Sequence, residues 1–217
     1  MNSKKCLLIL DMNCMLGYRQ YKNVFKSEIK NIEGVKPHLE SDNFVTIYRP
    51  NFELFMHTLF SKKSDFIDVA VWSNQNKDET DIQLNEYFRN MKHQLKFVLF
   101  SKNSNNLDYY SLFFNKKEAS QLIPYAIDRN LDIVFNKHTK YNKQNTLLIS
   151  NFPNLNKKFQ ENDIVIPLYH PKNERISLTR DNYLFYVQEY LHFLISSVNT
   201  NACKLKYKNS FWIFRDS

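Results

Sequence analysis

The stretch LLILDMNCML, residues 7–16, decides the fold, because its apolar run ends on one acidic residue, Asp11. Such a run is typical of a buried strand, and an open parallel sheet forms its ligand crevice at the carboxyl ends of its strands. A carboxylate at that position is well placed to act as a nucleophile or a metal ligand. Asn13 stands where a second carboxylate would complete an acid/base and metal-binding pair. We therefore expect an active-site fold that lacks part of its chemistry.

Short apolar runs with β-branched residues recur along the chain. Amphipathic helical patterns lie between several of them, and this alternation predicts an α/β domain with a mostly parallel sheet and helices on its faces. The expected strands are residues 6–10, 67–72, 97–100, 146–149 and 164–168.

Three segments show helical patterns: residues 50–59 after an N-terminal proline, residues 78–91, and residues 184–198 after an N-cap at Asp181. Residues 18–43 are charged and weakly periodic, which indicates an insertion after the first strand that forms a flap over the site. We expect residues 1–200 to form one domain, with residues 201–217 as a basic-aromatic tail packed on it.

The composition excludes several classes of protein. Two glycines leave no room for a phosphate-cradling Gly-rich loop or a dinucleotide fingerprint. Three cysteines without CxxC spacing indicate neither a disulfide framework nor a zinc site. No leader pattern and no apolar run of membrane-spanning length occurs. We expect an intracellular protein of the cytosol or nucleus, with import into an organelle left open.

The formal charge of +8 favours polyanionic partners such as RNA, acidic protein surfaces or phosphorylated peptides. Lys, Asn, Tyr, Phe and Ile are all abundant, however, and an A/T-rich coding sequence would produce this without selection for charge. Within the basic-aromatic tail, residues 204–215 offer rings that could stack on bases or pack on the domain.

Polar residues follow several predicted strands, in a set that suits phosphoryl transfer through an aspartyl-phosphate. That reaction needs a nucleophilic carboxylate, a hydroxyl and a cation to hold phosphate oxygens, and further acids to bind magnesium. The candidates are Asp11 and Asn13, Ser73, a basic residue at Arg129 or Lys137, and Ser150 with Asn151.

The order and spacing of these residues resemble the haloacid dehalogenase superfamily, and within it the C-terminal-domain (CTD) phosphatases of the NLI-interacting-factor-like group. The closest resemblance is to the phosphatase domain of ubiquitin-like-domain-containing CTD phosphatases. It implies a HAD-like Rossmannoid three-layer α/β domain with an insertion after strand 1 and a C-terminal helical segment. The segments that carry it are residues 7–16, 48–50 (YRP), 69–74 (VAVWSN), 131–137 (LDIVFNK), 140–150 (KYNKQNTLLIS) and 164–167.

The resemblance assigns a role to each strand end. Asp11 matches the phosphate-accepting nucleophile, and Asn13 the acid/base aspartate. Ser73 matches the phosphate-binding hydroxyl, with Asn74 beside it. From the residues alone, Asp11 could equally bond neighbouring backbone amides, and Ser73 could cap a helix.

The remaining motifs depart further from the family. Arg129 corresponds best to the family's lysine, with Lys137 as a nearby substitute, although both are surface charges by default. Ser150 and Asn151 stand where the family has paired aspartates for Mg²⁺. With Asp11 and Asn13 they form a vestigial metal site that we expect not to bind the ion.

These departures weaken catalysis. Acid/base catalysis typically contributes roughly a hundred- to ten-thousand-fold, and Asn13 can neither supply nor accept a proton at neutral pH. We therefore expect a pseudophosphatase that serves as a binding or structural subunit of a larger assembly with a protein partner. The alternatives are a weak Mg²⁺-dependent protein Ser/Thr phosphatase acting on phosphopeptides, and an RNA or ribonucleoprotein-binding component.

Overall fold

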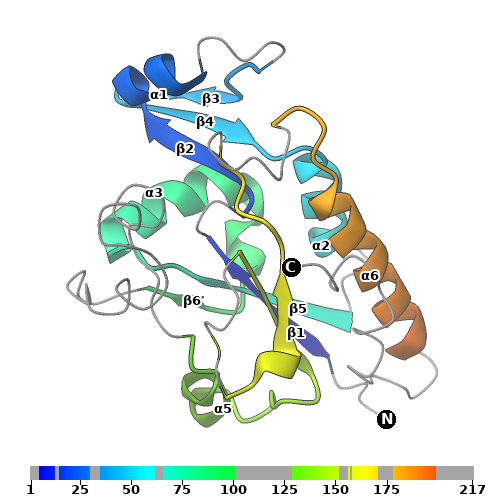
Figure 1. Cartoon of the computed structure of the whole chain (residues 1–217). Coiled ribbons are helices and arrows are strands. Elements are labelled where there is room, and N and C mark those ends of the chain that lie inside the picture. Colours follow the sequence, from blue (N-terminus) through cyan, green and yellow to red (C-terminus); the bar gives the residue numbers. More distant parts are fainter. Residues whose placement is uncertain are drawn as a thin grey trace.

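A five-stranded parallel sheet forms the centre of the molecule in the computed structural model, with strand order β6-β5-β1-β7-β8 (Figure 1). The structure describes residues 5–12, 15–29, 35–61, 66–100, 129–151, 156, 158–170 and 178–198. The strands are β1 (Cys6–Asp11), β5 (Ile67–Trp72), β6 (Val98–Leu99), β7 (Thr146–Ser150) and β8 (Asp163–Val165). They confirm the predicted strands, although β6 and β8 are shorter than expected.

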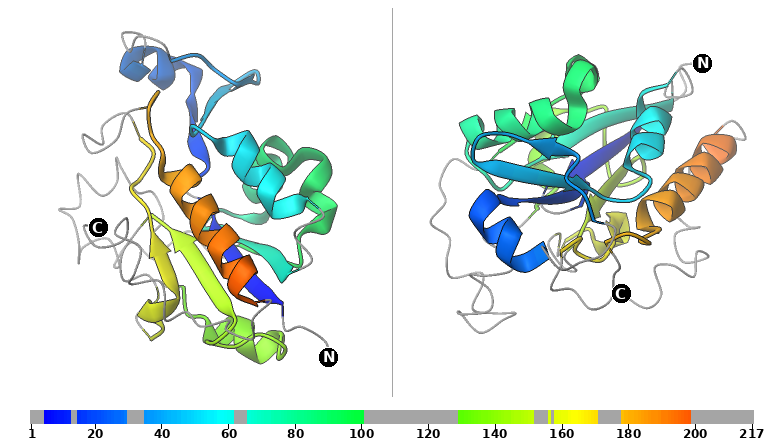
Figure 2. Two further views of the ribbon diagram at one scale, coloured as in Figure 1. Left: turned by 90° about the vertical axis from the view of Figure 1, so that its right-hand side faces the viewer. Right: turned by 90° about the horizontal axis from the view of Figure 1, so that it is seen from above.

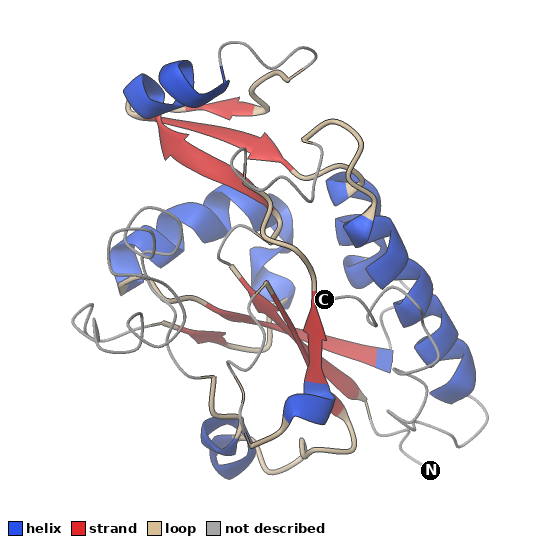
Figure 3. Ribbon diagram, in the orientation of Figure 1, coloured by secondary structure: helices blue, strands red, loops and turns tan. Residues whose placement is uncertain are grey.

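Alternate residues of β1 face two separate cores. Leu8 and Leu10 pack in the larger core, with side chains from helices α2 (Phe52–Phe60), α3 (Lys77–Phe88) and α6 (Tyr183–Val198). Leu7 and Ile9 point to the other face, which is covered by Leu131 and neighbouring residues around helix α5 (Asp132–Lys137). Figures 2 and 3 show helices on both sides of the sheet. The predicted α/β class with both faces covered is therefore confirmed.

The insertion after β1 forms a second, three-stranded antiparallel sheet. Its order is β2-β4-β3, with β2 (Gly17–Tyr21), β3 (Leu39–Glu40) and β4 (Phe44–Tyr48), and helix α1 (Lys22–Ile29) follows β2. At Gly17 a Cβ atom would lie 2.5 Å from the Ile47 carbonyl oxygen, so the close pairing of β2 with β4 requires glycine. The sequence predicted the insertion but not its sheet.

Two helices differ from the predicted bounds. Helix α2 begins after Asn51, whose φ of 65° is left-handed, rather than at Pro50. Helix α3 ends at Phe88 and continues as a 3-10 helix, η2 (Arg89–Gln94). A second 3-10 helix, η4 (Gln160–Asn162), precedes β8.

The predicted tail, residues 201–217, lies outside the described residues.

A buried ion pair joins the end of β4 to the start of α6. The Arg49 guanidinium donates from Nε and Nη2 to the two Asp181 carboxylate oxygens, each at 2.8 Å, and both side chains are 0% exposed. Asp181 also accepts from the Tyr183 backbone N–H at 3.0 Å, which fits its predicted place at the start of the last helix. Among the described residues no helix is long and apolar enough to cross a membrane.

Candidate functional site

Three neighbouring strands bring predicted site residues together at their carboxyl ends. Asp11 is the last residue of β1 and lies level with Trp72, the last residue of β5. Ser73 follows Trp72 directly in the chain. On the other side Leu10 pairs with Ile149, so Ser150 at the end of β7 lies beside Asp11 in the adjacent strand. The strand ends thus meet at the end of the sheet where the sequence predicted a site.

Asp11 forms a buried ion pair with Arg129. The guanidinium donates from Nη2 at 3.1 Å and from Nε at 3.3 Å to Oδ2, and both side chains are 0% exposed. The Arg129 Cζ atom also lies 5.2 Å from the centre of the Trp72 ring. The default interpretation of Arg129 as a surface charge is therefore wrong, because it lies inside the molecule against the carboxylate.

The Ser73 hydroxyl is engaged within its own loop. Its Oγ accepts from the Gln75 backbone N–H at 3.1 Å and from the Thr80 hydroxyl at 2.9 Å. It is not the helix cap that we considered, because Asn76 caps α3 by accepting from the Glu79 N–H. These bonds hold Ser73 at the strand end with little exposure.

Asn74 is a buried polar residue next to this loop. It is 1% exposed, and neither polar atom of its side-chain amide has a hydrogen-bond partner among the described residues. Leaving such a group unpaired is unfavourable by roughly 1–3 kcal/mol.

The β7 end offers poor ligands for magnesium. Ser150 and Asn151 are both buried there, and neither carries a charge. Mg²⁺ is usually bound through one or two carboxylates together with waters and substrate phosphates. The neighbouring strand end adds one carboxylate, Asp11, and that group is the ion-pair partner of Arg129. In the described ranges no three His, Cys, Asp or Glu side chains are grouped to hold a metal ion. The donor set thus does not fit Mg²⁺.

The other predicted residues lie elsewhere. Lys137 is exposed in the last turn of α5, and the chain that follows it reaches Asp68 near the start of β5, away from the Asp11 edge. The structure therefore does not bring Lys137 to Asp11. Phe135 is partly buried against the smaller core. Asn13 lies outside the described residues.

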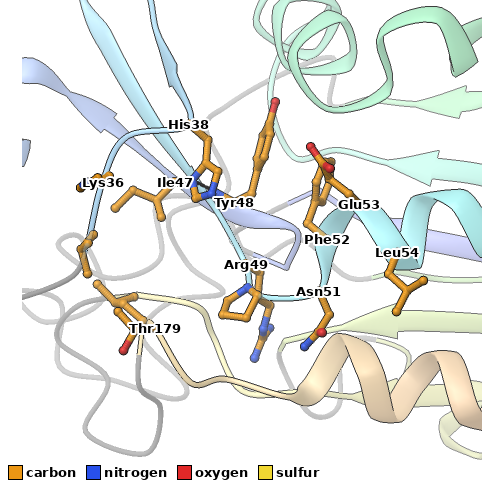
Figure 4. Close-up of a pocket in the computed structure, with 13 residues that line it drawn as sticks. Lys36, His38, Ile47, Tyr48, Arg49, Asn51, Phe52, Glu53, Leu54 and Thr179 are labelled. Carbon is orange, nitrogen blue, oxygen red and sulfur yellow. Dashed lines mark hydrogen bonds between the residues drawn. The ribbon is translucent and has the colours of Figure 1, made fainter.

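A pocket that the sequence did not predict opens where β4 meets α2 (Figure 4). Its volume is about 550 Å³, which is within the range of small-ligand sites. The walls come from the segment before β3, the β4–α2 junction and the segment before α6. They are lined by Val35, Lys36, His38, Ile47, Tyr48, Arg49, Pro50, Asn51, Phe52, Glu53, Leu54, Leu178 and Thr179.

Aromatic packing and hydrogen bonds hold one wall of the pocket in place. The Tyr48 and Phe52 rings stack with centroids 4.2 Å apart, and the Tyr48 backbone N–H donates to His38 Nδ1 at 3.1 Å. The Tyr48 hydroxyl donates to the Glu86 carbonyl oxygen; burial raises its pKa above the usual value. Arg49 ties this wall to the segment after Asp11 by donating to the Met15 carbonyl oxygen at 3.3 Å.

Comparison with known proteins places the fold. No family model matches the sequence, and no curated protein matches it. The solved structure of Fcp1, an essential RNA polymerase II CTD phosphatase, has a TM-score of 0.50 and 11% identity, over 87% of this chain and 50% of that chain. A fission yeast Fcp1 variant bound to beryllium fluoride has a TM-score of 0.50 and 10% identity, over 93% of this chain and 57% of that chain.

These likenesses define a class by fold: the chain has the HAD-like α/β fold of the CTD phosphatases. The resemblance expected from the strand-end residues is thus confirmed at the level of the fold. The chain spans about half the length of the solved chains that it matches.

Proposed function

We propose that this chain is a pseudophosphatase, which keeps the CTD-phosphatase fold and serves as a binding or structural subunit of a larger assembly. The observation that carries the proposal is the buried Asp11–Arg129 ion pair, in which both side chains are 0% exposed. An attacking carboxylate oxygen must come within about 3–3.5 Å of the phosphorus atom. A fully enclosed carboxylate held by a guanidinium cannot make that approach to a phosphopeptide.

The surrounding residues support the same conclusion. Asn13 occupies the acid/base position in the sequence and carries no titratable group. Ser150 and Asn151 stand in place of carboxylates at the β7 end. A Mg²⁺ ion, whose charge would offset that of an incoming phosphate dianion, therefore lacks the carboxylate ligands that would hold it there. Nucleophile, proton transfer and metal binding are thus each impaired by a different residue.

One feature supports a binding role. The pocket at the β4–α2 junction has the size and the mixed apolar and charged lining of a ligand site. Binding of a partner's side chains there needs neither a nucleophile nor a metal.

Hydrolysis of p-nitrophenyl phosphate and of a Ser/Thr phosphopeptide, with and without Mg²⁺, tests the catalytic half. We expect rates at background for wild type and for Asp11→Asn, and no heat of binding when wild type is titrated with Mg²⁺. Mg²⁺-dependent turnover that Asp11→Asn abolishes would contradict the proposal and favour the weak phosphatase. The calorimetry needs no variant, so it remains informative if Asp11→Asn fails to fold.

Size-exclusion chromatography of an extract from cells that make the protein tests the binding half. We expect the chain to elute far above its 26.1 kDa mass. Elution at the monomer position would contradict a subunit role and leave the catalytic result unaffected.

A further inference from the structure

Three lysines converge on one buried carboxylate at the opposite end of β5 from the Asp11 site. Lys5 Nζ and Lys96 Nζ lie 3.8 Å and 3.4 Å from Asp68 Oδ1, and Lys140 Nζ lies 3.1 Å from Oδ2. The Tyr141 hydroxyl donates to Oδ2 at 2.6 Å. We call Lys5, Lys96 and Lys140 the lysine edge.

The lysine edge carries more positive charge than Asp68 requires. Burial of Asp68 raises the pKa of its carboxyl, but hydrogen bonds from Tyr141 and Lys140 and the charge of Lys96 hold the pKa below its ordinary value. Three ammonium groups face one carboxylate, which leaves a formal excess of two positive charges. The carboxylate is 1% exposed, whereas the lysines are 41%, 45% and 63% exposed, so the excess charge faces solvent.

The backbone under the lysine edge is held in place. The Asn145 side-chain amide donates to the carbonyl oxygens of Lys5 at 3.3 Å and Lys140 at 3.1 Å, which joins the start of β1 to the loop before β7. Asn162 donates to the carbonyl oxygens of Lys143 and Thr146 in the same loop. The lysines therefore project from a preorganised surface, which lowers the entropic cost of binding.

An aromatic pair lies beside these lysines. The rings of Phe97 and His138 stack with centroids 4.2 Å apart and planes 7° from parallel, and both residues are partly exposed. Burial lowers the pKa of His138, and Lys137 and Lys140 lower it further. At neutral pH the imidazole is therefore an uncharged aromatic ring beside several ammonium groups.

We propose that the lysine edge, with the Phe97–His138 pair, is a binding surface for single-stranded RNA. The ammonium groups suit phosphate oxygens, and neutral aromatic rings beside them suit bases better than they suit an acidic peptide. Within the described ranges Asp68 is the acid with which each of the three lysines pairs. The surface is separate from the Asp11 site, because Asp68 lies near the start of β5 whereas Asp11 lies level with Trp72 at its end. Helix α5, which directly precedes His138, lies at the end of the main sheet away from the insertion (Figures 1 and 2).

Fluorescence polarisation with a labelled oligouridylate of about 20 nucleotides, titrated at several KCl concentrations, tests this surface. The test variant is Lys96→Gln/Lys140→Gln, which leaves Lys5 and Tyr141 to pair with Asp68. The matched control is Lys22→Gln/Lys77→Gln, which removes the same charge from ion pairs on α1 and α3. Lys137→Gln, which removes a charge that acts on His138, is a second test variant that leaves the Asp68 ion pairs intact.

We expect wild type and the control to bind with similar affinity. The test variant should lower the slope of log affinity against log salt by about 1.4, since each single-strand phosphate contact contributes roughly 0.7. Lys137→Gln should lower this slope by about 0.7. Absence of binding by wild type, or equal loss in the control, would overturn the proposal. Competition by polyglutamate as effective as that by the RNA would overturn it in favour of an acidic protein partner.

Discussion

The buried Asp11–Arg129 ion pair constrains what the strand-end carboxylate can do. Both charges are removed from water, so their mutual attraction and further hydrogen bonds must offset the loss of hydration. In such a pair each side chain is needed chiefly because the charge of the other would otherwise be buried without a counterion. We therefore treat Asp11 as the counterion of Arg129.

Asp11→Asn should lower the free energy of unfolding by about 3 kcal/mol, because it leaves the Arg129 charge buried without a counterion. Asp11→Asn/Arg129→Met should recover part of this loss, since it removes both charges. Urea denaturation followed by circular dichroism measures both. Asp81→Asn, in the exposed Lys77–Asp81 pair, is the control and should produce no measurable change.

A double variant that is less stable than the single variant would contradict this account of the pair. So would an Asp11→Asn protein as stable as wild type, which would show that the carboxylate is not required as a counterion.

Asp68 predicts a pH dependence with a definite sign. The folded-state pKa of its carboxyl lies below the ordinary value of 3.8, so the ionised carboxylate stabilises the fold above that pH. The contribution disappears as the pH falls from 3.8 through the folded-state pKa. The difference in unfolding free energy between wild type and Asp68→Asn should be constant from about pH 7 to about pH 5 and shrink below pH 3.8. Urea denaturation at each pH measures it, and a difference that grows on acidification would contradict this sign.

At the residue scale the sequence predicted Asp11 at a strand end and offered Arg129 as one of two candidate basic residues, but it did not predict their contact. The two residues are 118 positions apart, and the burial of Arg129 depends on the packing of Trp72 from a third segment. A charged residue with no helical or strand pattern around it resembles a surface charge in sequence. Only the assembled fold shows that it faces a carboxylate.

Among the elements, α6 is attached to the rest of the molecule by both apolar and ionic contacts. Its buried residues enter the larger core, while Asp181 at its start binds Arg49 at the end of β4. The ion pair thus sets the position of the helix start relative to the insertion sheet and to one wall of the pocket.

Asp181→Asn should lower the free energy of unfolding by about 3 kcal/mol, because Arg49 would stay buried without its counterion. The asparagine can still accept from the Tyr183 N–H, so this variant separates the ion pair from the helix start. Thermal and urea denaturation measure the change. Glu189→Gln, which removes a half-exposed carboxylate from α6, is the matched control. Equal effects of the two substitutions would show that the buried pair has no special weight.

Apolar runs in the main sheet were readable from sequence, whereas the insertion sheet was not. β1, β5 and β7 are buried on both faces, which produces near-continuous apolar runs. β2 reads GYRQY, and its pairing with β4 joins residues more than 20 positions apart. Neither its composition nor its spacing distinguishes it from a polar loop.

Over the whole molecule, the fold persists at 10–11% identity to the matched phosphatases. What the chain shares with them is the fold, which in this chain is built on a central buried strand and its parallel neighbours. This explains why the fold was predictable while the pocket and the lysine edge were not. Each of these two surfaces is formed by segments that are far apart in the sequence and share no recognisable sequence pattern.

The short outer strands of the main sheet limit how the molecule can associate. β6 spans two residues and β8 three, so each border exposes few backbone donors and acceptors. A second chain that continued the sheet at either border would gain only a few hydrogen bonds. Subunits that approach these two borders must therefore recognise this molecule through its side chains, which makes point substitutions there a direct way to map such contacts.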